Sequence, residues 1–211
     1  MRLAGSDFVW KSNKFRSING VWPWPDGMFS MNDASEEVIL VDADDQPLGA
    51  MGKLEAHRHG RLHRAFSIII HDGQGNLLLQ KRHVGKYHSG GLWTNACCGH
   101  PRPGEETGAA AERRLSEEMG FRCALRPLGT LIYRADVGGG LVEHELVHIF
   151  EGIYTGVVQP DPEEAEDYAW RPLGEIRREA AAEPDRFTVW FRRYLDEPSR
   201  LDAIGGSSRS P

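Results

Sequence analysis

GHPRPGEETGAAAERRLSEEMGF, residues 99–121, is the stretch from which the architecture of this chain can be worked out. Apolar residues recur in it at i, i+4 and i+8, which is the spacing of one helical face: Ala111, Leu115 and Met119. Gly120 follows directly and is a natural helix stop, because glycine readily adopts the left-handed conformation. The stretch therefore predicts a helix over Thr107–Met119.

The segment just before this helix, Trp93–Pro101, brings two thiols and an imidazole together within a few residues. In an extended chain, residues two apart face the same way. Cys98 and His100 would then share one face, and Cys97 would face the opposite side. We therefore expect one reactive thiol, Cys98, beside a metal-binding His100, with Cys97 in the core.

Strands are predicted on both sides of the helix, where runs of apolar and β-branched residues end at turn-forming residues. They cover residues 38–41, 64–70, 77–82, 131–136 and 141–150, with a hairpin turn at 72–76. Two more helices are predicted, at 172–183 and after Asp185, which we expect to cap the last one. That last helix has apolar residues at i, i+3, i+4 and i+7: Phe187, Trp190, Phe191 and Tyr194. This order of elements predicts a mixed sheet with helices on both faces.

The composition describes one globular domain. The 211 residues, 40% hydrophobic and 27% charged, fit a single domain, which we place at 36–201. Residues 202–211 are expected to form a flexible tail. Residues 1–35 are expected to be a poorly ordered leader, or alternatively an arm that packs on the domain through its tryptophans.

Charge and cysteine usage exclude several classes of protein. The net charge of −6 argues against nonspecific nucleic-acid binding, which needs a basic face. No run approaches the roughly 18 apolar residues of a membrane span, and the N-terminus lacks the apolar core of a signal peptide. Three cysteines fit reduced thiols better than a disulfide framework. We therefore expect a cytoplasmic protein without membrane or nucleic-acid partners.

Histidines and glutamates outside the helix predict a metal site. Glu143 and Glu145 lie two residues apart on a predicted strand, so both carboxylates point to one face while His144 points away. We group these two glutamates with three histidines: His57, His63 and His100. Imidazoles combined with carboxylates suit Mn²⁺ or Zn²⁺ better than Ca²⁺.

The spacing within residues 99–121 resembles the Nudix box, G-x5-E-x7-R-E-U-x-E-E-x-G-U, in which U is an apolar residue. The matching positions are Gly99, Glu105, Arg113, Leu115, Glu117, Glu118, Gly120 and Phe121. This resemblance implies an α/β fold, a Nudix-type α/β/α sandwich with a mixed sheet. Glutamates on one helical face collect a hard cation, which in turn holds a diphosphate.

The chain departs from this pattern at Arg114, where Nudix hydrolases carry a glutamate that binds metal and activates water. The departure puts hydrolase chemistry in doubt. Arg113–Glu117 and Arg114–Glu118 are also ion pairs at i, i+4, each contributing only about 0.3–0.5 kcal/mol. We assign this structural role to Glu117, and we expect Glu118 to bind a metal ion or bridge a diphosphate.

A second resemblance, from about Lys53 to Trp190, is to the type I isopentenyl-diphosphate isomerases, which have the Nudix fold. It is carried by five segments: Lys53–His57, Leu62–Ser67, Thr94–Pro101 (Thr-Asn-Ala-Cys-Cys-Gly-His-Pro), Tyr133–Ala135 and Val142–Glu145. The Lys-x-x-x-His spacing favours His57 over His59 as the first metal histidine. The resemblance implies a 1,3-proton shift that converts isopentenyl to dimethylallyl diphosphate through a carbocation-like state.

The same resemblance implies roles for individual residues. Cys98 and Glu145 would be the two proton-transfer groups, in either order, with Tyr133 hydrogen-bonded nearby. Trp190 would stabilise the cation, although a purely structural role beside Phe187 and Phe191 stays open. Three cations would hold the diphosphate: Lys53, Arg82 and Lys86. A Mg²⁺ ion would bridge the diphosphate to Glu118, and the pocket for the short alkyl tail is expected to be small, apolar and closed to water.

Two other functions remain to be weighed against this one. A Nudix diphosphate hydrolase would release phosphate or a mononucleotide from nucleoside diphosphate compounds. A structural zinc or protein-interaction module would keep the fold without catalysis, and Cys98→Ala would then change neither function nor metal content. For the isomerase we expect a small-molecule diphosphate substrate and a monomer or weak dimer.

Overall fold

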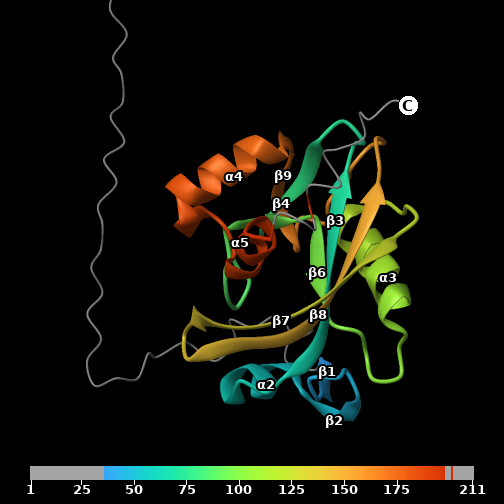
Figure 1. The fold of residues 1–211 in the computed structure, drawn as a ribbon, viewed down its shortest axis with the longest axis vertical. Coiled ribbons are helices and arrows are strands. Elements are labelled where there is room, and N and C mark those ends of the chain that lie inside the picture. The colour runs from blue at the N-terminus through green and yellow to red at the C-terminus, as the bar shows by residue number, and fades with distance from the viewer. Residues whose placement is uncertain (1–35, 198–200, 202–211) are drawn as a thin grey trace, which may run out of the picture.

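Strands β3 (His63–His71) and β8 (Leu141–Ile153) run parallel to each other in the middle of a mixed sheet (Figure 1). The computed structural model describes residues 36–197 and 201, so the expected leader (1–35) and tail (202–211) lie outside the described residues. The other strand pairs are antiparallel. These strands are β1 (Glu37–Val41), β2 (Pro47–Gly52), β4 (Asn76–Arg82), β5 (Trp93–Asn95), β6 (Cys97–Gly99), β7 (Arg126–Gly138) and β9 (Ala165–Pro172).

Helices cover both faces of this sheet (Figure 1). Helix α3 (Thr107–Met119) packs on one face, and α4 (Leu173–Ala182) and α5 (Val189–Leu195) pack on the other. Side chains of β3 alternate between the two layers, as the period of a strand requires. Phe66, Ile68 and Ile70 join the core under α3, whereas Ala65 and Ile69 join the core under α4 and α5. The predicted α/β/α sandwich with a mixed sheet is confirmed.

The central helix has the predicted bounds, Thr107–Met119. Its apolar stripe is fully buried, and Gly120 ends it with a φ of 75° in the left-handed region. At the other end, the Glu106 carboxylate accepts a hydrogen bond of 2.8 Å from the backbone N–H of Ala109. Residues next to the helix in the sequence, Glu106 and Gly120, thus determine where it begins and ends.

The prediction for the last helix is wrong at its start. Asp185 lies in a separate 3₁₀ turn, η1 (Pro184–Arg186), and α5 begins only at Val189 after Thr188. Phe187 therefore precedes the helix in extended conformation. The spacing of the aromatic residues is helical, but the break after η1 was not visible in it.

Five elements were not predicted: β2, α2 (Lys53–His59), β5, β6 and β9. Strand β2 contains two glycines and is mostly exposed, so it shows no alternating pattern. Helix α2 spans only seven residues, too few for a helical period to be recognised. It matters nevertheless, because it carries His57.

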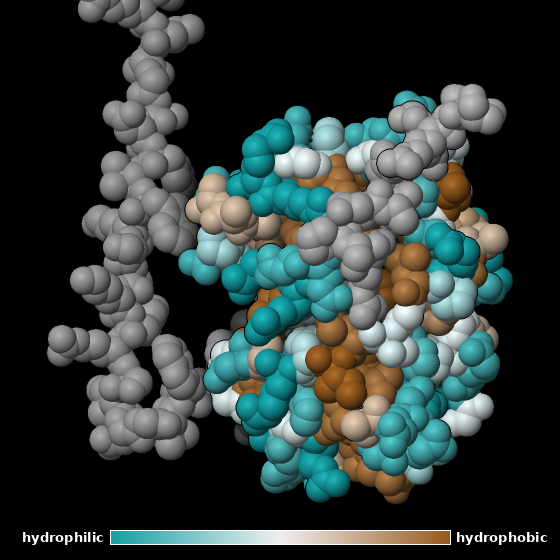
Figure 2. Space-filling model, in the orientation of Figure 1, coloured by the Kyte–Doolittle hydropathy of each residue, from teal (hydrophilic) through white to brown (hydrophobic). Residues whose placement is uncertain are grey.

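Hydrophilic residues cover most of the face shown in Figure 2, and hydrophobic residues emerge in a band along its middle. Exposed apolar atoms are normal at the surface of a folded protein. Within residues 36–197 and 201, no helix has the length and apolar character needed to cross a membrane.

Candidate active site

Ten of the twelve predicted site residues line one pocket: Lys53, Arg82, Lys86, Cys98, His100, Glu118, Tyr133, Glu143, Glu145 and Trp190. The remaining two, His57 and His63, are fully buried. The pocket has a volume of about 1100 Å³, and much of its lining is charged. The whole pocket is therefore larger and more polar than the small apolar space expected for the alkyl tail, because the side chains predicted to bind metal and diphosphate form much of its wall.

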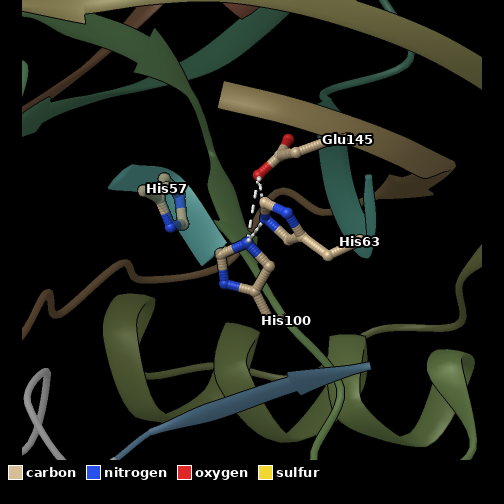
Figure 3. A group of neighbouring side chains, drawn as sticks. All are labelled: His57, His63, His100 and Glu145. Atoms are coloured by element: carbon tan, nitrogen blue, oxygen red, sulfur yellow. Dashed lines mark hydrogen bonds and ion pairs between the residues drawn. The ribbon is translucent and has the colours of Figure 1, made fainter. Parts of the chain in front are cut away.

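Three imidazoles and a carboxylate meet in one cluster: His57, His63, His100 and Glu145 (Figure 3). His100 Nε2 lies 3.0 Å from Glu145 Oε1 and 3.2 Å from His63 Nε2. His63 Nε2 is 3.7 Å from the same Glu145 oxygen. These atoms come from segments far apart in sequence, and they converge because parallel strands β3 and β8 pair His63 with Glu145.

Strand β8 presents both predicted glutamates to the pocket. Glu143 and Glu145 line the pocket, while the ring of His144 between them contacts the backbone oxygen of Gly60 at 2.9 Å. On the other side of β8, Tyr133 of β7 pairs with Glu145 and donates a hydrogen bond of 2.7 Å to its Oε2. Both orientations follow from the two-residue period of the strand.

His57 and Glu143 have the features of metal ligands. Their Nε2 and Oε2 atoms are buried 3.3 Å apart, without the geometry of a hydrogen bond and with no other hydrogen-bond partner among the described residues. The Nδ1 atoms of His57 and His63 contact backbone oxygens at 2.6 and 2.8 Å, which places their protons on Nδ1 and leaves Nε2 as an acceptor. His59, by contrast, is exposed. The donor set therefore fits Mn²⁺ or Zn²⁺.

A residue that sequence reasoning missed completes this region. His88, in the segment between β4 and β5, is 8% exposed, and its Nε2 lies 2.9 Å from Glu143 Oε1. His88, His57 and Glu143 together form a second possible metal-binding group. A single histidine in a glycine-rich segment gave no sequence signal.

Cys98 and Cys97 face opposite sides of β6, as predicted. Cys97 is fully buried in the core under α3, whereas Cys98 lines the pocket. The Cys98 thiol donates to Asn95 Oδ1 at 3.2 Å and lies 3.3 Å from Ser67 Oγ. Asn95 is held in turn by its amide group, which donates to the backbone oxygens of Ile68 and Cys97 at 3.1 and 2.9 Å.

Packing explains the glycine at position 99, which is also the first residue of the Nudix-box pattern. Gly99 pairs with Phe66 of β3, and a Cβ atom at this position would meet the Phe66 ring at 2.9 Å. Glycine therefore leaves room for the Phe66 ring at this position. The same strand register places Cys98 opposite Ser67.

The pKa values of Cys98 and Glu145 are shifted in opposite directions by their surroundings. Burial raises the pKa of the Cys98 thiol to about 12, although hydrogen bonds with Ser67 and Asn95 oppose the shift. Burial and the nearby Glu143 would raise the pKa of Glu145, but the neighbouring imidazoles of His100 and His63 outweigh them and lower it.

Burial also lowers the pKa of His100 to about 4, which keeps its imidazole neutral at pH 7. A neutral imidazole is the form that binds a metal ion.

Trp190 is nearly fully buried and still lines the pocket. Its indole N–H donates to Thr94 Oγ1 at 2.9 Å, and Thr94 Oγ1 donates to Asn95 Oδ1 at 3.1 Å. One chain of hydrogen bonds therefore connects Trp190 to the amide that accepts from Cys98. This position is compatible both with a structural role in the core and with contact to a substrate in the pocket.

The predicted cations line the pocket, and acidic residues engage several of them. Lys86 forms an ion pair with Glu164, whose other oxygen is 3.1 Å from Arg114. Lys53 pairs with Glu36 at 2.8 Å. The guanidinium of Arg82 lies over the Trp190 ring at 5.3 Å, and its buried Nε has no hydrogen-bond partner among the described residues.

Glu118 and Glu117 differ in burial and in their partners. Glu118 is buried and accepts hydrogen bonds from Arg114 at 2.7 Å and Gln80 at 3.1 Å. Glu117 is exposed and pairs with Arg113 at 3.1 Å. Glu118 is therefore the carboxylate of this helix that is held rigidly at the pocket.

Comparisons with known proteins agree on the family. The model of the NUDIX domain matches residues 61–191. The isopentenyl-diphosphate Delta-isomerase of Serratia proteamaculans is 53% identical over 162 residues, which cover 77% of this chain and 90% of that protein. The protein of the same name from Burkholderia multivorans is 53% identical over 161 residues, covering 76% of this chain and 92% of that protein.

Solved structures support the fold. The DR0079 protein of Deinococcus radiodurans aligns with a TM-score of 0.65 at 18% identity, over 76% of this chain and 98% of that one. The MutT protein of Methanosarcina mazei Go1 aligns with a TM-score of 0.55 at 19% identity, over 69% of this chain and 96% of that one. At such identities the likeness concerns the fold alone.

Proposed function

Because this chain belongs to the isopentenyl-diphosphate Delta-isomerases of the NUDIX family, we propose that it converts isopentenyl diphosphate to dimethylallyl diphosphate for isoprenoid biosynthesis. The observation that carries the proposal is the convergence of Cys98, Glu145 and Tyr133 on one pocket. They come from β6, β8 and β7, and neither fold stability nor metal binding alone requires a thiol at this place.

Cys98 and Glu145 would be the two proton-transfer groups. The reaction adds a proton at one carbon of an alkene and removes another nearby, so it needs groups on opposite sides of a flat substrate. Strand β3 lies between β6 and β8 and pairs with both, so the two side chains approach the pocket from separate strands. Tyr133 holds the Glu145 carboxylate by a hydrogen bond of 2.7 Å.

Trp190 would form the aromatic wall beside the positive charge that develops on the substrate. A desolvated cation–π contact contributes about 2 kcal/mol or more. Arg82 already lies over this ring in the structure, 5.3 Å from its centroid. The indole N–H is held by Thr94, so the ring cannot turn away without breaking that bond.

A Mn²⁺ or Zn²⁺ ion would be held by five residues: His57, His63, His100, Glu143 and Glu145. When bound, such an ion would supply positive charge that orients the Glu145 carboxylate and tunes its basicity. The buried unpaired atoms of His57 and Glu143 support this assignment.

The diphosphate would be bound by Lys53, Arg82 and Lys86, with a Mg²⁺ ion joining it to Glu118. The buried, unpartnered Nε of Arg82 supports an anion at this end of the pocket. A guanidinium binds two phosphate oxygens at once, whereas Lys86 supplies a point charge. In the structure Lys86 pairs with Glu164, so the diphosphate would replace a carboxylate as its partner.

Hydrolysis of a diphosphate is disfavoured by Arg114. Its guanidinium pairs with Glu117, Glu118 and Glu164, where a hydrolase would need a carboxylate free to activate water. We further propose that residues 36–201 act as one catalytic domain, as a monomer or weak dimer in the cytoplasm. The free cysteines of the described residues support a reducing setting such as the cytoplasm.

The deciding experiment is incubation of the protein with isopentenyl diphosphate, Mg²⁺ and Mn²⁺ or Zn²⁺ in D₂O, followed by NMR spectroscopy. Dimethylallyl diphosphate that carries deuterium is the expected product. Unchanged substrate under all metal conditions would refute the proposal. A parallel assay for phosphate or mononucleotide release from nucleoside diphosphate compounds tests the hydrolase.

A further inference from the structure

His88 contacts three parts of the pocket at once. Its Nε2 lies 2.9 Å from Glu143 Oε1, and its ring meets that of Trp190 edge-on at 5.8 Å. Its backbone oxygen accepts a hydrogen bond of 3.3 Å from Arg82. A buried imidazole that joins a metal-ligand candidate, the aromatic wall and a diphosphate cation is placed to organise all three.

We propose that His88 is a positioning residue of the metal centre, in which its Nε2–H donates to Glu143 Oε1 and leaves Glu143 Oε2 for the metal ion. This inference rests on the metal centre of the proposed function. It assigns no chemical step to His88.

The two oxygens of Glu143 differ in their partners. Glu143 Oε2 and His57 Nε2 are both buried without a hydrogen-bond partner among the described residues, and they lie 3.3 Å apart. Glu143 Oε1 already has the His88 imidazole as its partner. Oε2 is therefore the Glu143 oxygen that would be available to a metal ion.

His57 belongs to two groups of possible metal ligands. The donor atoms of His57, His63, His100 and Glu145 lie within 4.8 Å of one another, and so do those of His57, His88 and Glu143. His57 has only Nε2 to offer, because its Nδ1 is bonded to the Lys53 backbone oxygen at 2.6 Å. The unpaired Glu143 Oε2 lies 3.3 Å from that Nε2 and can share an ion with it, whereas His88 Nε2 already contacts Glu143 Oε1.

The neighbouring residue fits this tautomer of His88. Ser89 Oγ lies 3.2 Å from His88 Nδ1, so a hydroxyl that donates to Nδ1 leaves the ring proton on Nε2. Ser89 has a φ of 53°, in the left-handed region that residues other than glycine rarely adopt. Such backbone conformations persist where surrounding structure holds them.

The test compares the affinity of His88→Gln and His88→Leu for Mn²⁺ and Zn²⁺, by competition with a coloured chelator, in the full chain. Glutamine keeps an N–H donor and leucine does not. Loss of a residue that supports a metal ligand typically weakens metal binding about 10–100-fold. We expect this loss for His88→Leu and an affinity within about threefold of the wild type for His88→Gln. His59→Leu, which removes an exposed imidazole from the ligand-bearing helix, is the matched control and should bind as the wild type does.

Equal loss in both variants would show that His88 is itself a ligand and would overturn the proposal, as would wild-type affinity in His88→Leu. If His88→Leu does not fold, the visible spectrum of the Co²⁺-loaded His88→Gln protein decides: an unchanged spectrum supports the positioning role, and an altered ligand field contradicts it. These readouts do not depend on turnover, so they stand even if the isomerase assay fails. A wild-type protein that binds neither ion would remove the metal centre and the proposal with it.

Discussion

Replacing either of the adjacent cysteines, Cys97 or Cys98, by alanine removes one sulfur atom, yet the two variants should behave differently. Cys98 lines the pocket and Cys97 is fully buried under α3. A positioned proton-transfer group contributes about 10²–10⁴-fold to rate. At 1.36 kcal/mol per tenfold, Cys98→Ala should raise the barrier by about 3–5 kcal/mol. Its kcat should fall by that factor, with little change in the affinity for the diphosphate.

Cys97→Ala should affect stability instead. Removal of one buried sulfur leaves a small cavity and costs about 1 kcal/mol, which corresponds to about 2–4 °C in Tm for a chain of this size. Its kcat should stay within about threefold of the wild type.

The assay is the rate of dimethylallyl diphosphate formation, measured with saturating metal and varied substrate, beside a thermal melt of each variant. Equal loss of kcat in both variants would refute the assignment of the two faces. Full activity of Cys98→Ala would remove the thiol from the mechanism. A selective loss of kcat in Cys98→Ala, with a normal melt, is the result that the structure predicts.

Three further predictions follow from the same contacts. Tyr133→Phe removes a hydrogen bond to the Glu145 carboxylate worth about 1.5–3 kcal/mol, so kcat should fall about 10–100-fold. The control is Tyr154→Phe, which loses a hydroxyl bonded to a loop backbone and should keep the wild-type kcat. Equal kinetics of the two variants would contradict the role of Tyr133. Removal of metal by a chelator should abolish activity. Adding back Mn²⁺ or Zn²⁺ at about 100 times its Kd should stabilise the fold by about 2.7 kcal/mol, or about 5–10 °C in Tm. A Tm that neither ion changes would argue against the metal centre. Arg113 lowers the pKa of Glu105, so this pair stabilises the fold above the unfolded pKa of about 4.3 and is lost as pH falls through the lower folded pKa. The stability difference between wild type and Glu105→Gln in urea, about 1 kcal/mol at pH 7, should therefore shrink below pH 4, and a constant difference would exclude this linkage.

Local patterns were enough for much of the fold. The stripe of Ala111, Leu115 and Met119 with Gly120 behind it contains its own period and stop, so the bounds of α3 could be read directly. The alternation of Glu143 and Glu145 placed both on one face for the same reason. Where the pattern was too short or irregular, as in α2 and β2, the prediction missed the element.

The sequence by itself therefore determined the fold class, the facing of Cys98 against Cys97, and ten of the residues that line the pocket. The fold class and the facing depend on the period of a helix or strand, which is a local property of the chain. The pocket residues were indicated largely by motifs that resemble those of known families. Only the tertiary structure decided which groups are partners. The pairing of His63 with Glu145 and of Glu145 with Tyr133 depends on the registers of β3, β8 and β7.

His88 and Glu164 show the same limit. Each lies in an irregular segment without a repeating pattern. Each acquires its role from residues at least fifty positions away in the chain: Glu143 for His88, and Lys86 and Arg114 for Glu164. No local period encodes such contacts, because loop conformation and strand register are set by packing of the whole domain. The sequence thus provides the chemical groups of the site, and the folded sheet determines their geometry.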